Sequence, residues 1–253
     1  QSSQNKKSTL GAHLAQLPVL LDECKDLGTR PFSIIARHAF IAETILRSAV
    51  ARNALSESRL SEFKRSLHTI TADFTNDFAS ALENSDERKK FTSKYGHLRP
   101  GTYDITSPRY DQRDDLFDIT SSNSDKQTAI PFELTHAETE TLTRLFAASG
   151  LGTIDPRKFI EYARLAITNR ERAKFIFTRH LSDALELIAN WGETQRLDRD
   201  ALAHITVQDL INHMVSPVLN DPEMHFKDLI EQRRREGENM GGIRLGYLIR
   251  DPR

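Results

Sequence analysis

The chain has 253 residues, with 35 lysines and arginines against 36 aspartates and glutamates, which gives a formal net charge of -1. This balance excludes the strongly basic class of nucleic-acid-binding proteins and gives no general attraction to anionic lipid. Its single cysteine, Cys24, excludes an internal disulfide framework and a cysteine-based zinc site, and is typical of a reducing cytosol. No run approaches the roughly 18 apolar residues needed to cross a bilayer. We therefore expect a cytoplasmic protein with no nucleic-acid or membrane partner.

The first part of the chain shows helical spacing of its apolar residues after a polar lead at 1–9, which we expect to be disordered. The first amphipathic helix is predicted to stop at Gly28, a residue that commonly ends helices. The second is predicted to begin with a cap at Thr29 and to run to about Ala51. Because this second helix is apolar on most of its surface, it is expected to be the central buried helix.

A third helix is predicted to open at Ser56 or Ser58, with a pattern that continues to Leu82, because apolar residues recur there at alternating spacings of three and four. The charged segment that follows, from Ser85 to Lys90, is interpreted as a solvated helical face. The stripe of the third helix is Leu60, Phe63, Leu67, Ile70, Phe74, Phe78 (or Asp77) and Leu82.

The second half of the chain carries two clear helix starts. Thr135 has a glutamate three residues later, the pattern of a capping box, and its helix is predicted to stop at Gly150. Asp155 followed by a proline is typical of a cap and a first helical position, and the pattern continues to about Trp191. Shorter helices are expected at 200–205, 207–215 and 223–237.

These patterns predict an all-α fold, a multi-helix domain with long antiparallel helices and one long irregular polar loop. Residues 10–119 are expected to form a first helical part that contains the loop. An acidic and then Ser/Thr/Asn-rich stretch predicts a linker at 120–134. Residues 135–253 are expected to form a second helical part, packed with the first as one domain.

The irregular loop from Tyr95 to Asp111 is the most informative stretch. It contains two glycines and two prolines, together with one histidine, two arginines, two aspartates and three tyrosines. Those side chains are the inventory of a polar site held on a loop by a helical scaffold. Long loops also use such groups to satisfy their own backbone, and the composition by itself leaves both interpretations open.

Three cations interrupt the apolar faces of the long helices: Arg37 in the second helix, and Arg170 and Lys174 in the helix that starts at Asp155. A buried charge must meet a carboxylate, a wet cavity or an anionic ligand. If the cations form structural ion pairs, each should be paired with a carboxylate and closed to solvent. If they form an anion site, at least two should face one open pocket with His97 and Arg109.

Two blocks of sequence resemble a known family. The motif Tyr95-Gly96-His97, continued by Pro100-Gly101 and Asp104, resembles one in the middle region of phosphoenolpyruvate synthase-like phosphotransferases, which include rifampin phosphotransferase and L-glutamine kinase. The segment Arg170-Glu171-x-x-Lys174-Phe175 is similar to a second signature of that region, and Pro31-Phe32 with Ala36-Arg37 fits it as well. The resemblance spans roughly residues 10 to 215.

Such enzymes combine an ATP-grasp-like nucleotide domain, a helical middle domain and a swivelling domain whose phosphohistidine carries the phosphoryl group to an acceptor. This chain has neither a nucleotide-binding Gly-rich loop nor the swivelling-domain histidine motif. The resemblance therefore implies an excised middle domain that binds a small-molecule acceptor and no cofactor, and is not competent alone. ATP, Mg²⁺ and the two missing domains are implied for the full-length protein.

The resemblance also implies the roles of the candidate residues. Either His97 or Glu171 would take the acceptor proton, and no metal ligands are expected. The chain departs from the rifampin enzymes, which have Arg-Gly-Pro at positions 98–100, so glutamine kinase or another amino-acid- or carbohydrate-pathway kinase fits better. The alternative is a helical interaction module with internal ion pairs and no catalysis. The cations implied to bind substrate or phosphoryl oxygens are Arg37, Arg99, Arg109, Arg170, Lys174 and Arg179.

Overall fold

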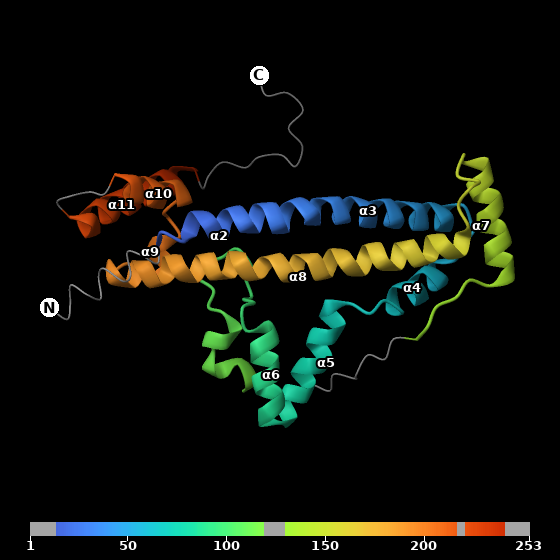
Figure 1. Cartoon of the computed structure of the whole chain (residues 1–253), viewed down its shortest axis with the longest axis horizontal. Helices are drawn as coiled ribbons and strands as arrows, with labels where there is room; N and C mark the ends of the chain where they lie inside the picture. Colours follow the sequence, from blue (N-terminus) through green and yellow to red (C-terminus); the bar gives the residue numbers. More distant parts are fainter. Residues whose placement is uncertain (1–13, 119–129, 217–220, 241–253) are drawn as a thin grey trace, which may run out of the picture. The chain divides into compact units, whose positions relative to one another are not determined.

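The computed structural model describes residues 14–118, 130–216 and 221–240, and every regular element in these ranges is a helix (Figure 1). The all-α prediction is confirmed. No helix in the described ranges is long and apolar enough to span a bilayer. The expected lead at 1–9 and most of the expected linker lie outside these ranges. The elements are α2 (Leu17–Glu23), the π-helical turn η1 (Cys24–Thr29), α3 (Arg30–Ala51), α4 (Glu57–Arg65), α5 (Ile70–Glu83), α6 (Ser85–Tyr95), the 3₁₀ turns η2 (Tyr110–Gln112) and η3 (Asp114–Phe117), α7 (His136–Ala148), α8 (Pro156–Thr194), α9 (Arg199–Leu202), α10 (Val207–Val215) and α11 (Pro222–Met240).

The chain divides into two compact units, and each is made of segments that are distant in sequence. The division differs from the expected parts at 10–119 and 135–253, because the chain leaves unit 2 for residues 101–108 and then returns to it. Within the described ranges, unit 1 comprises 14–21, 101–108, 183–216 and 221–240, and unit 2 comprises 22–100, 109–118 and 130–182.

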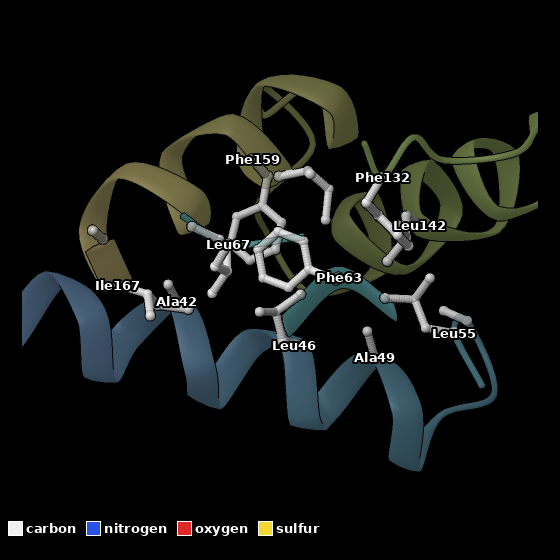
Figure 2. Packing of buried hydrophobic residues seen from close by; sticks show 14 of the residues in the cluster. Ala42, Leu46, Ala49, Leu55, Phe63, Leu67, Phe132, Leu142, Phe159 and Ile167 are labelled. Carbon is white, nitrogen blue, oxygen red and sulfur yellow. The ribbon is translucent and has the colours of Figure 1, made fainter. Parts of the chain in front are cut away.

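The larger core of unit 2 lies between α3, α4, α7 and the first half of α8. Phe63 of α4 is completely buried at its centre, and Figure 2 shows its ring beside Leu46 of α3 and Phe159 of α8. The buried face of α3 carries four alanines at helical spacing, of which Ala39, Ala42 and Ala49 belong to this core. These small side chains let neighbouring helices approach the α3 backbone closely.

A second core of unit 2 is aromatic and holds α5 and α6 together. Phe74 packs edge-on against Tyr95, with ring centroids 5.1 Å apart, and Phe91 lies 4.9 Å from the same tyrosine. The Tyr95 hydroxyl donates to the Asp77 carboxylate at 2.9 Å. Burial, together with this carboxylate, raises the pKa of Tyr95 to about 12. The last residue of α6 is thus fixed immediately before the irregular loop.

The predicted third helix is two helices, α4 and α5, so the prediction of a single helix here is wrong. Ser56 caps α4 as expected, but α4 ends at Arg65, and Thr69 begins α5 by accepting a hydrogen bond from the Ala72 amide at 3.2 Å. Phe63 belongs to the larger core, and Phe74 to the aromatic one. The sequence pattern does not reveal the end of α4, because the apolar residues keep a helical spacing both before and after the break between α4 and α5.

The predicted stop at Gly28 is also wrong, because the chain stays helical through η1 into α3. Thr29 has helical dihedrals, and its hydroxyl donates to the Cys24 carbonyl at 3.2 Å instead of capping α3. Gly28 lies against α8: a Cβ atom on it would come within 2.5 Å of the Phe177 Cβ. The glycine therefore serves close helix packing and not helix termination.

Replacing Gly28 with alanine is expected to destabilise unit 2 by about 1–3 kcal/mol, because the added methyl has no space against Phe177. Gly237 of α11 is the matched control, since it is helical and exposed and a Cβ there would meet nothing within 4 Å. Gly237→Ala should stabilise its helix by roughly 0.5–1 kcal/mol. Urea unfolding of both variants measures the two free energies. A stabilising Gly28→Ala would contradict the close packing.

Unit 1 is built on the last part of α8 together with α9, α10 and α11, whose apolar faces form one core. The cap at Thr206 begins α10, and the Asp209 carboxylate also pairs with Arg233 of α11. Burial opposes ionisation of Asp209, but the bonds from Arg233 and Thr206 prevail and lower its pKa. The three short helices predicted in this region are confirmed, with boundaries shifted by at most a few residues.

Candidate functional site

A polar cavity of about 530 Å³ in unit 2, which we call the basic pocket, gathers several chemically reactive or charged side chains. One face of α6 forms a wall, the irregular loop forms a second, and α8 contributes one arginine. Four cations surround a single carboxylate there, so the cavity has a surplus of positive charge and suits an anion. Its lining is Arg88, Lys89, Thr92, Ser93, His97, Arg109, Asp111 and Arg179.

The loop wall is held in place by backbone hydrogen bonds that fold the loop onto itself. The Tyr110 amide donates to the Leu98 carbonyl at 2.8 Å, and the Asp111 amide donates to the Gly96 carbonyl at 3.1 Å. A Cβ on Gly96 would lie 2.3 Å from the Thr92 carbonyl oxygen and 2.8 Å from the Asp111 Cβ. Only glycine permits this approach, so the residue before His97 fixes the path of the loop.

Arg109 and Asp111 form a bidentate pair on this wall. The Arg109 guanidinium donates to both oxygens of Asp111, at 3.0 Å from Nε and 2.8 Å from Nη2. This geometry orients the guanidinium plane and neutralises one of the four cations. Lys89 pairs with the exposed Asp86 carboxylate at 3.5 Å, so the surplus of positive charge in the lining comes mainly from Arg88 and Arg179.

Arg88 and Arg179 are exposed cations that backbone carbonyls hold at the cavity. The Arg88 Nε donates to the Ala81 carbonyl at 2.9 Å, and its guanidinium lies 5.3 Å from the centre of the Phe117 ring. Arg179 of α8 donates from Nη2 to the Lys94 carbonyl at 3.3 Å. A guanidinium has five N–H donors, so both side chains keep donors for an anionic ligand.

His97 is only 1% exposed, and its ring packs against Phe175 with centroids 5.1 Å apart. It is therefore a nearly buried imidazole at the edge of a cavity lined with cations. Among the residues implicated by the sequence, the basic pocket brings together His97, Arg109 and Arg179.

Arg99 does not line the pocket, although it lies two residues after His97. Its side chain is 5% exposed, and its Nη2 donates to the Ser182 hydroxyl at 2.9 Å and to the Ser182 carbonyl at 3.3 Å. Arg99 thus ties the start of the loop to α8. The geometry gives it a positioning role in place of the ligand-binding role expected from sequence.

Arg37, Arg170 and Lys174 are placed elsewhere in unit 2, and neither expected arrangement is found. Arg37 and Lys174 are exposed, and Arg170 is half-buried with its guanidinium 5.7 Å from the centre of the Phe40 ring. Within the described ranges none of the three forms an ion pair or lines the basic pocket. Along α8, the residues of the larger core end at Ile167, and the next contact with the aromatic core is made by Phe175. Arg170 and Lys174 lie between these two contacts, so they are not enclosed as expected.

Glu171, the alternative proton acceptor, also lies outside the basic pocket. The residue is half-buried, and its Oε2 is buried without a hydrogen-bond partner among the described parts of the chain. Of the two candidates for proton transfer, only His97 contacts the cavity.

Sequence reasoning missed the α6 wall of the pocket. Arg88 and Lys89 are exposed, as the interpretation of a solvated face requires, but they also line the cavity with Thr92 and Ser93. The available signal was their spacing, which places these four polar residues on one face of the helix that leads into His97.

The described ranges contain no group of three or more histidine, cysteine, aspartate or glutamate residues that could hold a metal ion. Comparison with known proteins found no matching family model, no matching curated protein and no matching solved structure.

Proposed function

We propose that the basic pocket binds the phosphoryl or carboxylate group of a small molecule, and that the chain is the acceptor-binding helical part of an ATP-dependent phosphotransferase. The observation that carries the proposal is the set of four cations around a nearly buried imidazole. The resemblance of the Tyr95–Asp111 loop and the 170–175 segment to phosphoenolpyruvate synthase-like enzymes supplies the reaction class.

The pocket supplies two kinds of group that phosphoryl transfer uses, cations and a proton acceptor. Cations hold and neutralise the transferring oxygens, and this electrostatic stabilisation is the main contribution of proteins to such reactions. In the proposal, Arg88 and Arg179 bind phosphoryl oxygens through their remaining N–H donors. His97 accepts the proton of the acceptor nucleophile as the nucleophile bonds to phosphorus and the P–N bond of the donor phosphohistidine breaks, which leaves the donor as free histidine.

The rest of the reaction would depend on parts that this chain does not supply. The proposal places the phosphohistidine donor, ATP and Mg²⁺ on missing ATP-grasp-like and swivelling domains, in a cytoplasmic enzyme. L-glutamine or another amino-acid- or carbohydrate-pathway metabolite is the proposed acceptor class. The chain alone would bind the acceptor but transfer nothing.

Calorimetric titration of the chain with inorganic phosphate, phosphoenolpyruvate and L-glutamine tests this proposal. Arg179→Ala is expected to weaken phosphate or phosphoenolpyruvate binding by about 10- to 100-fold, since a hydrogen bond to a charged group contributes about 1.5–3 kcal/mol. Lys174→Ala is the matched control, because Lys174 is an exposed cation of the same unit outside the pocket.

Each alternative gives a different titration result. A loss of affinity in Lys174→Ala, with Arg179→Ala unaffected, would move the anion site to the 170–174 segment. An absence of saturable binding by all three ligands would refute the assignment of the basic pocket as an acceptor site.

A further inference from the structure

An apolar groove of about 360 Å³, which we call the α3–α8 groove, lies between these two helices in unit 2 and shares no lining residue with the basic pocket. Ile35 of α3, with Leu165 and Ile176 of α8, forms much of its apolar lining. The Tyr162 hydroxyl of α8 lies 2.9 Å from Nδ1 of His38 on α3. This contact joins the two helices, so the groove is preformed.

Large apolar side chains stand exposed along both edges of the groove. On α8, Leu165 is 54% exposed and Ile176 is 57% exposed. On α3, Ile34 and Ile41 are 58% and 50% exposed, and they lie one turn before and one turn after His38 on the same helix face. The central helix predicted to be buried on most of its surface is therefore apolar and open to solvent on this side. Exposed apolar residues gathered in this way are typical of interaction surfaces.

The flanks of the groove are cationic. Arg172 lines it, Arg37 directly precedes His38, and Lys158 lies one turn before Tyr162. All three are exposed, and none forms an ion pair with another part of the described chain. One exposed carboxylate, Glu161, lies beside these three cations. The charge of the flanks is complementary to a ligand that carries carboxylates.

We propose that the α3–α8 groove binds an amphipathic helix of a partner protein, with an apolar stripe against the groove and acidic residues on both flanks. The lining of α8 extends from Tyr162 to Ile176, about 21 Å along the helix axis, which matches a partner helix of about four turns. Such docking is a common mode of peptide recognition. A second copy of this chain fits less well, because two-fold pairing would set one cationic groove surface against the same cationic surface of the other copy.

Binding of two designed helical peptides to the 253-residue chain tests the proposal by fluorescence anisotropy. Both peptides have 18 residues and the same leucine stripe, but one carries glutamates and the other lysines on its flanks. The acidic peptide should bind at least 10-fold more tightly, and Leu165→Glu should weaken its binding at least 10-fold. Phe40→Glu is the matched control, because Phe40 is 58% exposed on the opposite side of α3 from His38. It should change the affinity less than about twofold.

A charge reversal at Arg172 provides a second readout. Arg172→Glu should reduce or invert the preference for the acidic peptide while circular dichroism and the melting temperature stay unchanged. Equal binding of both peptides, or binding of neither, would overturn the proposal. A concentration-dependent dimer in sedimentation that Leu165→Glu abolishes would also overturn it, in favour of self-association.

Discussion

Phe63→Ala is expected to lower the free energy of unfolding by about 3–5 kcal/mol, because it removes a fully buried ring from the centre of the larger core. The Phe63 ring also makes an edge-on contact with Phe132 at 5.5 Å. The cluster that contains this ring also includes buried residues of α3, α7 and α8, so the resulting cavity could close only if several helices moved together.

Urea denaturation followed by circular dichroism measures this loss. Phe40→Ala is the matched control, because Phe40 carries the same side chain in a 58% exposed position. The control should cost less than about 1 kcal/mol. Equal losses for the two variants would contradict the assigned position of Phe63 in the core.

Arg99→Met is expected to cost about 2–3 kcal/mol in stability and also to weaken phosphate binding, although Arg99 does not line the basic pocket. Methionine keeps most of the buried volume but loses the donors to Ser182. The start of the loop would then be released from α8. His97 and Arg109, which the same loop carries, would lose their fixed positions in the pocket wall.

Calorimetry at a temperature where the variant is still folded separates the two effects. Ser182→Ala is the control, because it removes the hydroxyl acceptor and keeps the Ser182 carbonyl. It should cost about 1 kcal/mol and change the phosphate affinity little. If Arg99→Met lowers the stability but binds phosphate normally, the positioning role is wrong and Arg99 is structural only.

The sequence predicted those parts of the fold that depend on local interactions. In the capping box, the Thr135 hydroxyl accepts a hydrogen bond from the Glu138 amide, and the Glu138 carboxylate accepts one from the Thr135 amide. At the start of α8, the Asp155 carboxylate accepts a hydrogen bond from the Arg157 amide at 2.7 Å. Caps involve residues two or three positions apart, so the pattern contains the whole interaction. The helices that begin with these caps therefore appear where they were expected.

The sequence failed where distant contacts decide the structure. Glycine is common at helix ends, which is why a stop was predicted at Gly28. In the structure Gly28 lies inside a continuous helical segment and allows close packing against Phe177, which is distant in sequence. Lys174 occupies an apolar position of its helix pattern, but in the described part of the chain its side chain is exposed. Periodicity shows which side of a helix is apolar, and it cannot show where a neighbouring helix ends.

The candidate site was predictable in part for the same reason. The composition of the Tyr95–Asp111 loop identified His97 and Arg109 directly. Arg88 and Lys89 could be assigned to the site only after α6 was seen to turn that face toward the loop. Arg99 was misassigned because its burial against Ser182 depends on a contact between segments 83 positions apart.

The position of the single tryptophan has a consequence for spectroscopy. Trp191 is 5% exposed in the core of unit 1, in edge-on contact with Phe226 at 5.0 Å. The tyrosines Tyr95, Tyr110 and Tyr162 belong to unit 2. Tryptophan fluorescence, excited at the long-wavelength edge of tryptophan absorption where tyrosine does not absorb, therefore reports the unfolding of unit 1. Tyrosine signals in near-ultraviolet circular dichroism report mainly the unfolding of unit 2. Coincidence of the two transitions would mean that both units unfold as one cooperative body.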